Sequence, residues 1–111
     1  MDSPPVYPTV TDVRVAGAGV PLGGSLHARG DPAPPAGLYA HGFGQTRRAW
    51  SATAAAQAAR GHAGLALDAR GHGGSGRNAE GDPYTGHQFT DDLIVLAGEQ
   101  PRPPLLVAAS M

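Results

Sequence analysis

The sequence predicts an α/β fold: a sheet that begins with an antiparallel hairpin and continues with parallel strands covered by helices. Polar and apolar residues alternate with period two in residues 12–15, which indicates the first strand of the hairpin. Residues 64–68 and 105–109 are apolar runs typical of buried parallel strands, and we expect the second run to be covered on both faces. Helix-forming segments separate the later strands, so the predicted order is ββ-βα-βα-β.

The first forty residues contain the hairpin and a linker. Residues 20–29 are expected to return antiparallel to the first strand. Residues 30–37 include three prolines and form a turn-rich linker, which ends on a short third strand over residues 38–40. Residues 1–9 also contain three prolines and are expected to be a disordered lead-in, so the folded domain would cover residues 10–111.

Two helices are predicted between the later strands. Thr46 can cap a helix over residues 47–60, which is mostly alanine, and Gly61 supplies the turn that ends it. The second helix opens with a capping box over residues 85–88. Its apolar face combines residues at i, i+4, i+7 and i+8, namely Phe89, Leu93, Leu96 and Ala97.

Composition and charge exclude several classes of protein. A net charge of −1 provides no basic field, so we expect neither a nucleic-acid nor a membrane partner. The chain has no cysteine, and its five histidines show no metal-ligand spacing, so no metal is expected. The glycines of residues 17–24 imitate a dinucleotide-binding motif but open no helix, so no organic cofactor is expected. The N-terminus does not resemble a signal peptide, which favours a cytoplasmic location. Arg47 and Arg48, at a predicted helix start, are expected to be solvated.

Three segments directly follow predicted parallel strands, and such loops meet at one edge of a sheet. They are His41-Gly42-Phe43-Gly44, the loop from Asp68 to Ser75, and Ser110-Met111. In this order they resemble motifs of the alpha/beta hydrolase fold family. The first is similar to the oxyanion-loop H-G-x-G, the second to the D-x-R-G-x-G-x-S loop, and the third to the start of the G-x-S-x-G nucleophile elbow.

The resemblance implies a role for each residue of these motifs. Ser110 would be the catalytic nucleophile, and the backbone N–H groups of Phe43 and Met111 would form the oxyanion hole. Ala108 replaces the first glycine of the elbow, a mild departure because alanine adds a single methyl group. The other motif residues are expected to structure the loops, and these are His41, Gly42, Gly44, Asp68, Arg70, Gly71, Gly73 and Ser75.

The identity of the nucleophile narrows the implied chemistry. In the family's haloalkane dehalogenases and epoxide hydrolases, the residue at the nucleophile position looks like an aspartate. Ser110 instead favours acyl transfer, followed by hydrolysis of an ester-like small molecule. The family's order of serine, acid and histidine implies that the acid and the histidine lie beyond residue 111. We therefore expect an N-terminal portion of an alpha/beta hydrolase domain, inactive alone, with residues 105–109 at an unfinished edge that promotes aggregation.

A second interpretation is non-catalytic. A binding protein or a degenerate remnant could keep this scaffold without turnover, because a fold does not determine a function. An acid and a histidine after later strands would favour the enzyme, and their absence would favour the binding protein. The sequence determines neither the substrate nor the oligomeric state.

Overall fold

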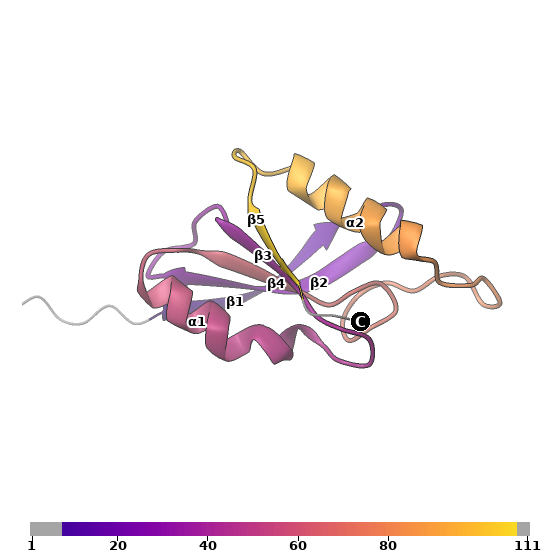
Figure 1. Cartoon of the computed structure of the whole chain (residues 1–111), viewed down its shortest axis with the longest axis horizontal. Coiled ribbons are helices and arrows are strands. Elements are labelled where there is room, and N and C mark those ends of the chain that lie inside the picture. Colours follow the sequence, from indigo (N-terminus) through magenta and orange to yellow (C-terminus); the bar gives the residue numbers. More distant parts are fainter. Residues whose placement is uncertain (1–7, 109–111) are drawn as a thin grey trace, which may run out of the picture.

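The computed structural model describes residues 8–108, which form a five-stranded sheet with one helix on each face (Figure 1). This architecture confirms the predicted fold class and the predicted order of elements. The helical elements within residues 8–108 are the 3-10 turn η1 (Arg47–Trp50), α1 (Ser51–Ala59) and α2 (Gly86–Gly98). The strands are β1 (Pro8–Ala16), β2 (Pro21–Arg29), β3 (Gly37–Ala40), β4 (Gly64–Leu67) and β5 (Leu105–Ala108).

The order of strands in the sheet is β1-β2-β4-β3-β5. β2 pairs antiparallel with both β1 and β4, whereas β3 pairs parallel with both β4 and β5. The last residues of the three parallel strands lie side by side, because Ala40 is in register with Leu67 on one side and with Ala108 on the other. The loops that leave these strands therefore start at the same end of the sheet, where the parallel strands have their carboxyl ends.

A separate hydrophobic cluster covers each face of the sheet. The face under α1 is packed with Tyr39, Ala54 and Ala66, and the small side chains allow α1 to approach the strands closely. The face under α2 carries the larger cluster, which consists of Leu22, Leu38, Leu65, Leu67 and Leu96.

Among the described residues, no helix has the length and apolar character needed to cross a membrane.

The first strand begins earlier than the sequence predicts. Pro8 and Thr9 belong to β1 and pair with Arg29 and Ala28, so these two residues are part of the sheet rather than of the lead-in. Pro8 is tolerated because it opens an edge strand, where a missing N–H removes no ladder bond from the interior. Residues 1–7 lie outside the described part of the chain.

The predicted helix over residues 47–60 is divided into η1 and α1. Arg47 donates its backbone N–H to the Asp68 carboxylate at 2.7 Å, and the Trp50 indole N–H donates to the Ala40 carbonyl at 2.9 Å. These two anchors bind the first turn to the ends of β4 and β3, and the turn adopts the tighter 3-10 form. Thr46 caps it as predicted, and Gly61 ends α1 with a φ of +91°.

The last strand differs from the prediction of coverage on both faces. Within the described residues, β5 is paired on its β3 side only, and Leu105 and Leu106 are 71% and 50% exposed. The edge position agrees with the expectation of an unfinished sheet. Ala109, the predicted last residue of the strand, lies outside the described residues.

We predict that the exposed side of β5 makes the polypeptide of residues 1–111 self-associate. Leu105→Lys should shift its sedimentation profile towards the monomer, because a charge on an edge strand opposes pairing with another chain. Ile94→Lys is the matched control, since Ile94 is 62% exposed but lies on α2. Equal effects of the two substitutions, or no effect of Leu105→Lys, would contradict the prediction.

Candidate active site

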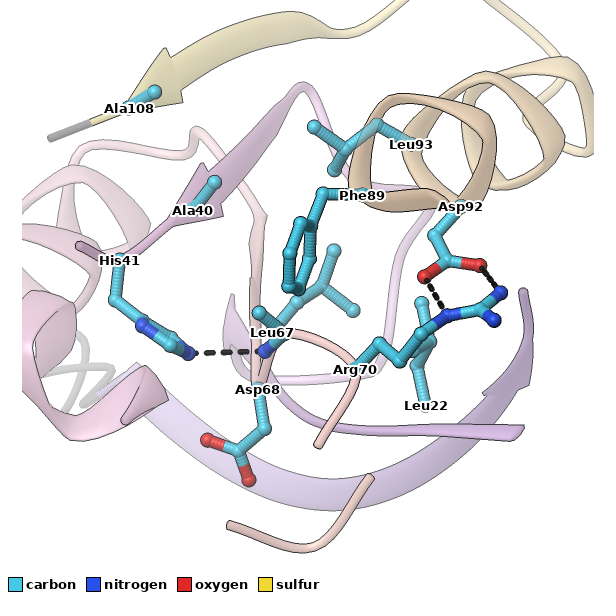
Figure 2. Close-up of a pocket in the computed structure, with 11 residues that line it drawn as sticks. Leu22, Ala40, His41, Leu67, Asp68, Arg70, Phe89, Asp92, Leu93 and Ala108 are labelled. Atoms are coloured by element: carbon cyan, nitrogen blue, oxygen red, sulfur yellow. Dashed lines mark hydrogen bonds and ion pairs between the residues drawn. The ribbon is translucent and has the colours of Figure 1, made fainter. Parts of the chain in front are cut away.

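The ends of β3, β4 and β5 and the first half of α2 surround a cavity of about 160 Å³ (Figure 2). Its walls are mostly apolar, and its polar side chains come from the loops after β3 and β4 (His41, Asp68 and Arg70) and from α2 (Asp92). Among the described residues, no three His, Cys, Asp or Glu side chains are grouped as metal ligands would be. The lining residues are Leu22, Ala40, His41, Leu67, Asp68, Ala69, Arg70, Phe89, Asp92, Leu93 and Ala108.

His41 joins the loop after β3, residues 41–45, to the loop after β4, residues 68–76. Its ring is buried, and its Nδ1 atom lies 2.7 Å from the Gly42 carbonyl oxygen. Its Nε2 atom lies 2.9 Å from the Ala69 backbone nitrogen (Figure 2). A carbonyl only accepts and a backbone N–H only donates, so Nδ1 carries the proton and Nε2 accepts. Both ring nitrogens of His41 are therefore engaged in hydrogen bonds to the backbone.

The Phe43 N–H of the β3 loop is not bonded to any group of residues 8–108. Gly42 donates its N–H to the Gln45 side-chain oxygen at 3.1 Å, and Gly44 donates its N–H to Nε2 of His72 at 3.4 Å. Between them, the Phe43 N–H has no hydrogen-bond partner within residues 8–108. The turn needs glycine at position 44, where φ is +77°. The two bonds on either side fix the path of the loop around Phe43.

Asp68 is the centre of the β4 loop and is fully buried. Its carboxylate accepts hydrogen bonds from the Arg47 backbone at 2.7 Å, the Arg47 guanidinium at 2.7 Å and the Gly74 backbone at 2.8 Å. Burial alone would raise the pKa of Asp68, but these N–H donors and the charge of Arg47 hold that pKa below its ordinary value. The expectation of a solvated Arg47 is therefore wrong.

The glycines of the β4 loop are required by close neighbours. A methyl group on Gly73 would overlap the Asp68 carboxylate, and one on Gly71 would lie 2.7 Å from the Tyr84 ring. Both glycines have positive φ, +46° and +78°, which L side chains rarely adopt. The loop can wrap around the Asp68 carboxylate because these two positions have no side chain.

Ser75 anchors the far end of the β4 loop to the hairpin. Its buried hydroxyl accepts a hydrogen bond from the Gly23 N–H at 2.9 Å and donates one to the backbone carbonyl of Asp68. Gly76 adds a backbone bond to the Pro21 carbonyl at 2.7 Å. The loop is thus fixed at both ends.

Arg70 fixes the loop to α2 through a buried ion pair. Its Nε and Nη2 atoms donate to the two Asp92 carboxylate oxygens at 3.0 and 2.8 Å (Figure 2). The Asp92 hydrogen bond is the main reason that the pKa of Arg70 is raised. Sequence reasoning did not predict this pair. A signal was present, because Asp92 follows Phe89 by three residues and falls on the apolar face of α2.

The structure brings together the loops after β3 and β4, which carry nine of the eleven predicted site residues, from His41 to Ser75. Ser110 and Met111 lie outside the described residues. Ala108, two residues before Ser110, lines the cavity together with Ala40 and His41.

We predict that Gly73→Ala destabilises the full-length protein, meaning the product of the complete open reading frame, far more than Gly81→Ala. Both positions have positive φ, so each alanine should cost about 1 kcal/mol of backbone strain. Only the Gly73 methyl group meets another atom, which should add about 1 to 3 kcal/mol. The measurement is the free energy of unfolding in urea, and equal losses would contradict the packing described for Asp68.

Asp68→Asn should make stability less dependent on acid pH. The folded-state pKa of Asp68 is lowered, so its contribution is complete above the pKa of an unfolded aspartate and is lost as the pH falls through the folded value. We expect a cost of about 3 to 5 kcal/mol at neutral pH that shrinks below about pH 4. Exposed Asp82→Asn is the control, and a pH-independent difference for Asp68→Asn would argue against an ionised Asp68.

Comparison with known proteins places these features in a family. The sequence profile of the Alpha/beta hydrolase family matches residues 38–111, about two thirds of the chain. A search of curated proteins finds no significant match.

Solved structures include close matches to the fold. A mutant epoxide hydrolase from Vigna radiata is 25% identical with a TM-score of 0.77, and the match covers 91% of this chain and 31% of that one. A second Vigna radiata epoxide hydrolase is 22% identical with a TM-score of 0.78, covering 91% and 32%. A mutant epoxide hydrolase from Solanum tuberosum is 23% identical with a TM-score of 0.79, covering 92% and 32%.

The chain therefore spans about a third of the length of these structures and nearly all of it is used in the match. The fold, the strand order and the two described loops agree with the sequence match. This chain belongs to the alpha/beta hydrolase family.

Proposed function

We propose that this chain is the nucleophile-bearing part of a serine hydrolase that transfers an acyl group to Ser110 and then hydrolyses it. The observation that carries the proposal is the register of β3 and β5, which pairs Ala40 with Ala108. Phe43 follows Ala40 by three residues, and Ser110 follows Ala108 by two. Because the two strands are adjacent and parallel, a nucleophile and an oxyanion donor would leave the sheet beside each other.

The proposed reaction proceeds in two steps. The Ser110 hydroxyl attacks the carbonyl carbon of an ester and gives its proton to a histidine, and the N–H groups of Phe43 and Met111 stabilise the negative charge on the carbonyl oxygen. The alcohol leaves with that proton, and an acyl-serine remains. Water then attacks the acyl-serine, which releases the carboxylic acid and restores Ser110.

In the proposed reaction, the catalytic base and the catalytic acid come from residues outside the described part of the chain. His41 uses both ring nitrogens to bind the loops, so it is not free to take a proton from Ser110. The carboxylates of Asp68 and Asp92 each bind an arginine, which leaves neither to orient a catalytic histidine. The proposal accordingly assigns no hydrolase activity to residues 1–111 alone.

The structural neighbours described above are epoxide hydrolases, and this chain matches about a third of their length. Ester hydrolysis is favoured over epoxide opening by the residue at the nucleophile position. A carboxylate can attack a carbon of an epoxide and open the ring, whereas a serine activated by a histidine is suited to attack on a carbonyl carbon. Ser110 therefore supports acyl transfer.

We predict that the full-length protein hydrolyses a p-nitrophenyl ester and that Ser110→Ala lowers kcat by a factor on the order of 10⁶. Exposed Ser51→Ala is the matched control and should retain kcat. A fluorophosphonate probe followed by peptide mass spectrometry should find the adduct on Ser110 and not on Ser51.

Two outcomes would contradict the proposal. Turnover of styrene oxide without ester hydrolysis would assign epoxide chemistry to this scaffold. No turnover of either substrate and no probe labelling, in a protein that unfolds cooperatively, would favour the non-catalytic binding protein.

A further inference from the structure

Two histidines bind the β3 and β4 loops reciprocally. His41, on the β3 loop, accepts the N–H of Ala69 from the β4 loop at 2.9 Å. His72, on the β4 loop, accepts the N–H of Gly44 from the β3 loop at 3.4 Å. Nδ1 of His72 lies 3.1 Å from the Arg70 carbonyl oxygen in its own loop, just as Nδ1 of His41 faces a carbonyl in its own. We call these two residues the histidine clasp.

The four bonds specify one protonation state for both rings. In each ring Nδ1 faces a carbonyl oxygen and must donate, and Nε2 faces a backbone N–H and must accept. This geometry assigns both histidines the tautomer that has its proton on Nδ1. Their ring centroids are 5.0 Å apart, and the ring of His72 is also 6.0 Å from that of Phe43, so the clasp packs against the side chain of the residue between its two bonds.

We propose that the histidine clasp positions the Phe43 N–H for the oxyanion, an inference that rests on the proposed function. The clasp reaches the residues on either side of Phe43: His41 holds the Gly42 carbonyl, and His72 holds the Gly44 N–H. With both neighbours fixed, the Phe43 peptide has one orientation and its N–H is left without a protein partner within residues 8–108. A donor fixed before the reaction needs no reorganisation when the charge develops. His41 and His72 are thus positioning residues.

The direct test measures the tautomers in the full-length protein labelled with ¹⁵N-histidine. Two-bond ¹H–¹⁵N correlation spectra, assigned by loss of signals in His41→Phe and His72→Phe, should show the proton on Nδ1 of both rings. Amide exchange at Gly44, relative to the intrinsic rate, should be faster in His72→Phe than in the wild type, because the Gly44 N–H loses its acceptor. A proton on Nε2 of either ring at pH 8 would overturn the clasp.

Kinetics test the positioning role. His72→Phe keeps a ring beside Phe43 but removes the acceptor, and we expect kcat for the p-nitrophenyl ester to fall about 10-fold with little change in KM. His72→Gln restores an acceptor and should recover part of that loss, whereas exposed His87→Phe should change neither constant. An unchanged kcat in a folded His72→Phe protein would overturn the positioning role.

Absence of ester hydrolysis in the wild type would contradict the proposed function. The tautomers and the exchange rates would still show whether the two histidines form the clasp.

Discussion

The buried carboxylate of Asp68 is the interaction on which the arrangement of the site depends. It accepts N–H groups from the backbone and guanidinium of Arg47 and from the backbone of Gly74, so it joins the start of η1 to the far side of the β4 loop. Arg47 extends this network to the hairpin, because it also donates to Ser25 on β2 and lies 3.4 Å from Asp12 on β1. A buried charge without such donors would be costly, and the three N–H groups are the reason that Asp68 stays ionised.

Elements with a local signal could be predicted from the sequence. The capping box at the start of α2 is present as expected, with Thr85 and Gln88 each bonded to the backbone of the other. The two buried ion pairs could not be predicted in this way, because their partners are more than twenty residues apart and meet only when the sheet forms. Arg47 looked like a solvated helix residue, and only the position of Asp92 on the apolar stripe of α2 suggested a buried partner, which is Arg70.

In the candidate site, too, some features could be predicted from the sequence and others could not. Parallel strands end at one edge, so the meeting of the β3 and β4 loops follows from the order of motifs in the sequence. The path of each loop does not, because it depends on backbone conformations such as the positive φ values of Gly44 and Gly71. Those conformations decide that His41 and His72 exchange hydrogen bonds across the loops and that the Phe43 N–H is left available. Sequence patterns could identify the residues but not their partners.

The central claim is that Ser110 and the Phe43 N–H act on the same carbonyl group. The most direct measurement is a crystal structure of the full-length protein after reaction with a phosphonate ester, whose tetrahedral phosphorus resembles the intermediate of ester hydrolysis. The account predicts phosphorus bonded to Ser110 Oγ and a phosphonyl oxygen about 2.7 to 3.1 Å from the Phe43 backbone nitrogen. A phosphonate on another residue, or a phosphonyl oxygen directed away from the β3 loop, would contradict it.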